Sequence, residues 1–118
     1  MIYTGTVVAE SLHDESVLNF VAETGRKTEF LKKNPGTEQP ENVTVISFTV
    51  TDEMALAVAD EFSRLLKTGW YADFGHEFDR YVIFPGKVFH FAPKEIEKKQ
   101  KAIEYGKTLG IPASQLDF

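Results

Sequence analysis

The sequence contains no cysteine among its 118 residues. This absence excludes disulfide bonds, zinc sites built on thiolates and thiol nucleophiles. The chain also lacks an apolar run approaching the roughly 20 residues that span a bilayer, and its N-terminus lacks a basic segment followed by an apolar one. Together these absences predict a cytoplasmic protein that does not enter a membrane.

Positive charge is scarce as well. The formal net charge is −5 and the sequence pI is about 5.2, with the acidic excess in the first half of the chain. Binding a phosphate backbone requires a clustered positive surface. The lysines between Lys94 and Lys107 alternate with glutamates, which predicts a salt-bridged solvent face. The charge pattern therefore disfavours nucleic acid as a partner.

Aromatic residues, in contrast, are abundant. They make up 13% of the chain and include ten phenylalanines, and each buried aromatic removes about 150–250 Å² from water. The length fits one domain over residues 1–118, with a core large enough to exclude disorder. The eight glycines form neither a phosphate loop nor a dinucleotide fingerprint, so no cofactor is predicted.

Runs of β-branched and aromatic residues predict most of the strands. These runs cover residues 2–10, 43–50, 70–74, 80–84 and 87–91. Residues 17–31 are ambiguous, because Gly25 and Thr28 interrupt a helical stripe, and we expect a turn followed by a strand near residues 20–30. Pro35, Gly36 and Pro40 predict a surface loop over residues 32–42.

Two segments have helical spacing of apolar residues. The first begins after Thr51 and is expected to end at Gly69; the second begins near Pro93 and runs to about Leu109. The first helix is a natural crossover between parallel strands. The order of elements predicts an α+β two-layer sandwich related to ferredoxin-like folds. Its sheet is expected to be mixed and mainly antiparallel, with about five to six strands and both helices packed on one face.

The segment from Tyr81 to Phe91 predicts a hairpin with two apolar faces. If Phe84 faces Lys87, Tyr81 pairs with His90 and residues 82 and 83 pair with residues 89 and 88. One face then carries Val82, Phe84, Phe89 and Phe91, and the other carries Tyr81, Ile83, Val88 and His90. A sheet that is solvated on one face alternates apolar and polar residues. The hairpin is therefore expected to be central, with its second face covered.

Few residues suggest chemistry. Asp73, His76, Glu77 and Asp79 lie around one turn, and such a set can hold a divalent metal or form an acid–base pair. A solvated turn is the favoured interpretation, so no metal site is predicted, and Asp73, His76 and Glu77 are kept only as candidate ligands. His90 could titrate near neutrality, although a histidine bonded to Tyr81 or to the backbone is favoured. The catalytic residues stay unassigned, with His76, Glu77 and His90 as candidates.

Three segments resemble a group of small prokaryotic proteins of about this length, for which no activity is known. They are the Gly-Trp-Tyr-Ala-Asp-Phe run at residues 69–74, the hairpin at residues 82–89 and a C-terminal pattern. That pattern reads Glu-Tyr-Gly at 104–106, Leu-Gly-Ile-Pro at 109–112 and Gln-Leu-Asp-Phe at 115–118. The resemblance implies a prokaryotic cytosolic origin, and it assigns no catalytic role to any residue.

The leading hypothesis is a non-enzymatic, self-associating module, with a homodimer favoured. It would bind a partner or a small-molecule ligand through the sheet face opposite the helices. The candidate contact residues are aromatic or apolar, with one histidine: Trp70, Tyr71, Tyr81, Ile83, Val88 and His90. The alternative is a small enzyme or metal-dependent binder that uses the turn with Asp73, His76 and Glu77, together with His90.

Overall fold

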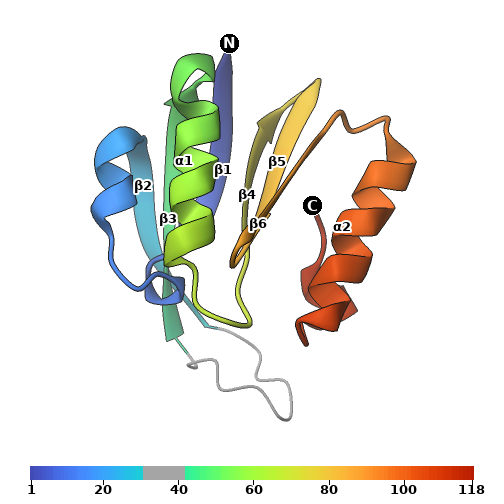
Figure 1. The fold of residues 1–118 in the computed structure, drawn as a ribbon. Helices are drawn as coiled ribbons and strands as arrows, with labels where there is room; N and C mark the ends of the chain where they lie inside the picture. The colour runs from blue at the N-terminus through green and yellow to red at the C-terminus, as the bar shows by residue number, and fades with distance from the viewer. Residues whose placement is uncertain (31–41) are drawn as a thin grey trace.

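Six strands form one sheet in the order β2-β3-β1-β4-β5-β6, and every neighbouring pair is antiparallel (Figure 1). The computed structural model describes residues 1–30 and 42–118. The strands are β1 (Ile2–Val8), β2 (Ala22–Phe30), β3 (Asn42–Thr51), β4 (Ala72–His76), β5 (Asp79–Phe84) and β6 (Lys87–Phe91). The helices are α1 (Asp52–Leu65) and α2 (Ile96–Thr108), with short 3₁₀ turns η1 (Ala9–Ser11), η2 (Ser16–Phe20) and η3 (Ala113–Gln115). The expected loop lies outside the described residues, except for Asn42, which begins β3.

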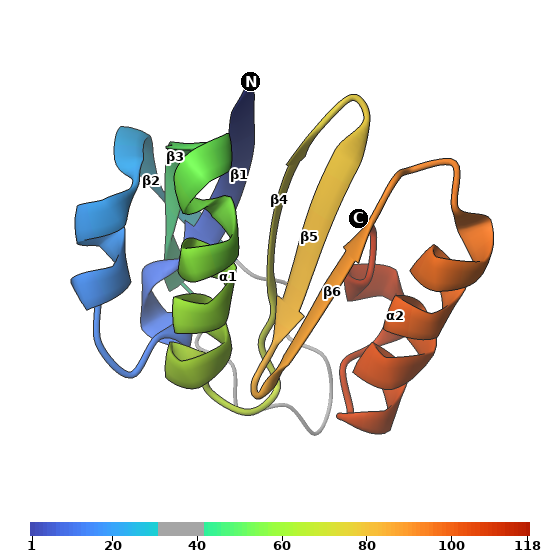
Figure 2. The ribbon, with the colours of Figure 1, turned by 45° about the horizontal axis from the view of Figure 1, so that its top comes forward.

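Helix α1 is the crossover that the sequence predicts. It connects β3 to β4, which run parallel to each other with β1 between them (Figure 2). Asp52 and Glu53 lie in its first turn, where negative charge is favourable. The helix ends at Leu65 and not at Gly69, because Leu66 turns extended, with ψ at 135°, and is buried. Gly69 instead takes a φ of 90° in the following turn, a conformation that suits glycine.

Helix α1 covers one face of the sheet with a core of aromatic and aliphatic residues. The ring of Phe62 lies 5.8 Å from Phe48 of β3 and 6.5 Å from Phe74 of β4, and all three side chains are buried. Burying one side chain of this size stabilises the fold by about 1.5–3 kcal/mol. This α1 face includes Tyr81 and Ile83 of β5.

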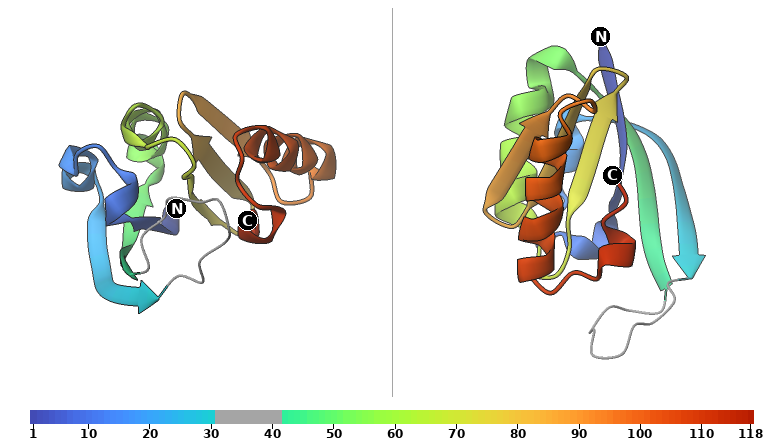
Figure 3. Two further views of the ribbon diagram at one scale, coloured as in Figure 1. Left: turned by 90° about the horizontal axis from the view of Figure 1, so that it is seen from below. Right: turned by 90° about the vertical axis from the view of Figure 1, so that its right-hand side faces the viewer.

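Helix α2 and the C-terminal tail cover the other face of β5 and β6. Val82, Phe84 and Phe91 pack there against α2 and the tail residue Leu116. Since successive residues of a strand point to opposite faces, α1 and α2 lie on opposite sides of this hairpin (Figure 3). The α+β class, the six-stranded sheet and the two helices are confirmed. The expectation of a mixed sheet is wrong, because every neighbouring pair is antiparallel, and so is the expectation that both helices share one face.

Gly106 makes the close approach of α2, the tail and the sheet possible. A Cβ at this position would lie 2.7 Å from Cδ2 of Leu116 and 3.1 Å from a ring carbon of Phe84. A larger residue would therefore push the tail away from α2. This packing shows how two small residues, Ala102 and Gly106, let α2 cover a sheet face made of phenylalanines.

The predicted register of the β5–β6 hairpin is confirmed. Tyr81 pairs with His90, and Phe84 pairs with Lys87 across the turn formed by Pro85 and Gly86. The N–H of Gly86 donates to the carbonyl of Ser63 at 2.8 Å, which ties the turn to α1. The expected turn and strand in residues 17–31 are also present, as η2 and β2. Within the described residues, neither helix is long and apolar enough to cross a membrane.

Candidate functional site

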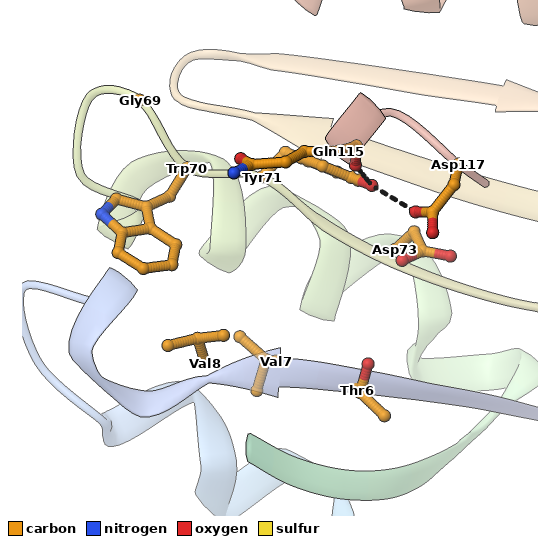
Figure 4. Close-up of a pocket in the computed structure, with 9 residues that line it drawn as sticks. All are labelled: Thr6, Val7, Val8, Gly69, Trp70, Tyr71, Asp73, Gln115 and Asp117. Carbon is orange, nitrogen blue, oxygen red and sulfur yellow. Dashed lines mark hydrogen bonds between the residues drawn. The ribbon is translucent and has the colours of Figure 1, made fainter. Parts of the chain in front are cut away.

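The candidate site begins where β1 and β4 separate. The two strands pair over three positions, from Thr4 with Gly75 to Thr6 with Asp73. Gly5 lies at the centre of this contact, and a Cβ there would be 2.5 Å from the carbonyl oxygen of Asp73 and 2.6 Å from Cβ of Phe74. Past this tight contact the strands diverge and leave a cavity of about 260 Å³. The cavity is lined by Thr6, Val7, Val8, Gly69, Trp70, Tyr71, Asp73, Gln115 and Asp117 (Figure 4).

The two ends of the cavity differ in polarity. The indole of Trp70 and the side chain of Val8 lie at one end, whereas Thr6, Asp73 and Asp117 lie at the other (Figure 4). Trp70 is the only tryptophan in the chain and is half-buried. Its backbone N–H donates to the carbonyl of Lys67 at 3.2 Å, which holds the turn that precedes the cavity wall.

Tyr71 joins the cavity wall to the C-terminal tail. Its hydroxyl donates a hydrogen bond to the carbonyl of Gln115 and lies 3.3 Å from Oδ1 of Asp117. Its ring lies 5.7 Å from the ring of Phe118. Burial raises the pKa of the Tyr71 hydroxyl, and the negative charges of Asp73 and Asp117 raise it further. Tyr71 therefore stays a neutral phenol that anchors the tail.

Asp73 is held by Arg80 on the adjacent strand. The guanidinium Nη1 of Arg80 lies 2.5 Å from Oδ2 of Asp73, and both side chains are 29% exposed. The arginine reaches across Gly75, where an added Cβ would lie 3.2 Å from its Cζ. Burial raises the pKa of Asp73; Arg80 opposes this shift, and the charge of Asp117 adds to it, so the pKa ends above its usual range. Burial is the main cause of this raised pKa, and the nearby carboxylate of Asp117 contributes less.

The structure separates the residues of the candidate metal site. Asp73 lies on the face of the sheet opposite α1, whereas His76 lies with Phe74 and Tyr3 on the α1 face. Glu77 is exposed in the turn between β4 and β5. Within residues 1–30 and 42–118, no three histidine or carboxylate side chains are close enough to hold a metal ion. The hypothesis of a metal site at this turn is therefore wrong for the described residues.

A second polar cluster forms on the α1 face around Asp79. Its Oδ2 accepts a hydrogen bond from the hydroxyl of Tyr3 and lies 2.6 Å from Nε2 of His90. The imidazole of His90 stacks on Tyr81, with ring centroids 4.0 Å apart and planes within 7°. His90 thus pairs with a carboxylate and stacks on Tyr81, whereas the expectation was a hydrogen bond to Tyr81 or to a backbone group.

His76 borders this second cluster but is engaged elsewhere. Its Nδ1 accepts the backbone N–H of Phe78 at 3.1 Å, so the neutral ring carries its proton on Nε2. Its ring lies 4.6 Å from the ring of Tyr3. His90 is 48% exposed, so the cluster is open to solvent on one side. It contains an Asp–His pair of the kind that supports general base chemistry, without an enclosing wall.

The predicted contact residues have different environments. Trp70 and Tyr71 line the cavity, and Val88 is half-buried beside the α1 core. Tyr81 and Ile83 are 6% and 0% exposed, since they lie under α1. Their proposed role as interface residues is therefore wrong, because they offer almost no surface to a partner. Their apolarity reflects the core of the chain itself.

Several site residues were not found from the sequence, among them Thr6, Asp117 and Tyr3. Thr6 and Asp117 line the cavity, and Tyr3 binds Asp79. Tyr3 and Asp79 are 76 positions apart, so no local spacing connects them. The tail containing Asp117 lies in the C-terminal pattern on which the predicted resemblance rests, and this was the signal available in the sequence.

Comparison with protein-family models, with curated proteins and with solved structures found no match to this chain. The resemblance to small prokaryotic proteins therefore stays a prediction. The function has to be argued from the geometry of the chain.

Proposed function

We propose that this chain is a cytosolic, non-enzymatic module that binds a small-molecule ligand in the cavity between β1 and β4. The observation that carries the proposal is the cavity itself, whose wall combines Trp70 with Asp73 and Asp117. Pockets for drug-sized ligands span about 300–1,000 Å³ and combine apolar walls with a few polar groups. At about 260 Å³, this cavity suits a smaller, metabolite-sized ligand.

Binding explains the polar groups of the cavity better than catalysis. Arg80 holds Asp73, and the tail holds the hydroxyl of Tyr71, so both groups already stabilise the fold. A general base needs a group that is free to accept a proton from the substrate. The raised pKa of Tyr71 makes its hydroxyl a poor acid near neutral pH. Because these groups are already bound within the fold, the cavity is better suited to binding a ligand than to catalysis.

A fragment library of mixed charge tests this proposal. Because Trp70 is the only tryptophan, its fluorescence reports occupancy of the cavity directly. We expect hits that change Trp70 emission and shift the backbone amide signals of residues 6–8 and 69–73. Thr6→Phe should fill the cavity and abolish these hits, whereas Thr4→Phe, on the same strand and outside the lining, should preserve them. A folded protein that binds no fragment would contradict the proposal.

A weak homodimer through β2 is a second candidate. The apolar face of the β5–β6 hairpin, from which the sequence predicts self-association, is covered by α2, so the remaining support comes from the edge of the sheet. Strand β2 is at the end of the strand order, and all nine of its residues are exposed. A two-fold axis at Thr28 would place each Lys27 opposite Glu29 of a second copy. Opposite charges at such positions stabilise antiparallel pairs.

A further inference from the structure

We infer that the ligand of the cavity is a small organic ammonium, in which a short chain links the charged nitrogen to a flat apolar group. This inference rests on the proposed binding function and names its ligand class. The ammonium would lie near Asp73 and Asp117, and the apolar group would lie between Trp70 and Val8. The division of the cavity into a carboxylate end and an apolar end motivates this orientation (Figure 4).

The charges at the polar end favour a cation. Two carboxylates, Asp73 and Asp117, line the cavity, and Arg80 binds one of them. Within the part of the chain that the structure describes, Asp117 forms no salt bridge. An ammonium group between the two carboxylates would offset their repulsion, whereas an anion would add to it. A charge-assisted hydrogen bond is also stronger than a neutral one.

The apolar end favours a flat group next to the charge. The indole of Trp70 presents a large aromatic surface, and Val8 supplies aliphatic contacts on the opposite wall. Aromatic faces attract cations as well as rings, so an arylalkylamine can use both properties of the indole. A polyamine without an apolar group would leave this end of the cavity unfilled. The cavity volume of about 260 Å³ limits the ligand to roughly one ring with a short chain.

A series of three probes of similar size isolates the effect of the charge. 2-Phenylethylamine, 2-phenylethanol and phenylacetate share a ring and a short chain, and at neutral pH they are cationic, neutral and anionic. Titration followed by Trp70 fluorescence should show the amine binding about tenfold more tightly than the alcohol, with phenylacetate weakest. Added salt should lower the affinity for the amine and leave the affinity for the alcohol unchanged, because screening acts only on the charged probe.

Two matched variants locate the interaction. Asp117→Asn keeps the shape of the side chain and should weaken amine binding about three- to tenfold, with little effect on 2-phenylethanol. Asp60→Asn makes the same change of charge on an exposed position of α1 and should leave amine binding unchanged. Equal loss in both variants would assign the preference to net charge and overturn the inference.

The outcomes separate this inference from the proposed function. If 2-phenylethanol or phenylacetate binds as tightly as the amine, the cavity binds ligands but the ammonium class is wrong. If none of the three binds while library fragments do, the ligand class is wrong and the binding function stands. If neither the probes nor the library bind to the folded protein, both proposals fail.

Discussion

The carboxylate of Asp79 lies between two side chains from distant strands, with its Oδ2 2.6 Å from Nε2 of His90. The hydroxyl of Tyr3 donates to the same oxygen, so one carboxylate links β1, β5 and β6. Burial acts to raise the pKa of Asp79, but the hydrogen bonds from Tyr3 and His90 outweigh it and hold the pKa below its usual range. Asp79 therefore stabilises the fold as an anion.

We expect Asp79→Asn to destabilise the protein by about 1–2 kcal/mol near neutral pH, since charge-assisted hydrogen bonds are lost. Because the pKa is lower in the folded state, this stabilisation is present above the unfolded pKa of about 3.9 and is lost as the pH falls through the folded pKa. Urea unfolding should be measured between about pH 7 and pH 3. The difference in the free energy of unfolding between wild type and Asp79→Asn should disappear below about pH 4. Asp60→Asn, the control, should show no such pH-dependent difference. A difference that does not change with pH would assign the effect to packing.

Gly5→Ala tests the close contact of β1 with β4 beside the cavity. The new Cβ would meet backbone and Cβ atoms at 2.5–2.6 Å, so the strands must move apart, at a cost of about 1–3 kcal/mol. Gly25→Ala on β2 is the matched control, because its Cβ would have nothing within 4 Å. The control should change the free energy of unfolding by less than about 0.5 kcal/mol. Equal effects in chemical denaturation would contradict the role given to Gly5.

The sequence predicts the locally encoded parts of this fold well. The β5–β6 register follows from the short turn at Pro85 and Gly86, which leaves one pairing for Tyr81 with His90. Helix α1 follows from its apolar spacing. The two apolar faces of the hairpin also indicated correctly that both are covered. The identity of the second cover could not be predicted, because α2 contributes small residues such as Ala102 and Gly106, which form no conspicuous stripe.

The cavity could not be predicted, because its walls meet only after the whole sheet has formed. Strand β1 inserts between β3 and β4, which brings Thr6 beside Asp73. The tail then returns to place Asp117 near Tyr71, 46 positions earlier in the chain. Strand order and the return of the tail depend on packing over the full chain, which no local pattern encodes. The sequence suggested a site at the polar turn with His76 because the residues of that turn are close in sequence. In the structure they lie on different faces of the sheet.

Tyr71→Phe should loosen the tail and lower the stability by about 0.5–1.5 kcal/mol, because the hydrogen bond to the carbonyl of Gln115 is lost. Hydrogen exchange at Leu116 should become faster. The folded pKa of Tyr71 is raised, so the neutral phenol stabilises the fold fully below about pH 10 and less at higher pH. The difference in the free energy of unfolding between wild type and Tyr71→Phe should therefore become smaller above that pH. Tyr105→Phe is the control, since within the described residues its hydroxyl forms no hydrogen bond; equal loss there would contradict the anchoring role.

The proposed β2 dimer makes a prediction about charge reversal. Lys27 and Glu29 form an exposed ion pair within one chain, with a distance of 2.8 Å between the charged atoms. In the dimer, a two-fold axis at Thr28 would bring each Lys27 opposite Glu29 of the second copy. Lys27→Glu or Glu29→Lys alone would then place like charges together and weaken the dimer by up to about tenfold, whereas the double reversal should restore it. Sedimentation velocity over a range of concentrations measures this directly. A wild-type protein that stays monomeric at high concentration would contradict the dimer. The charges of β2 would then be explained as residues that prevent this edge strand from pairing with another chain.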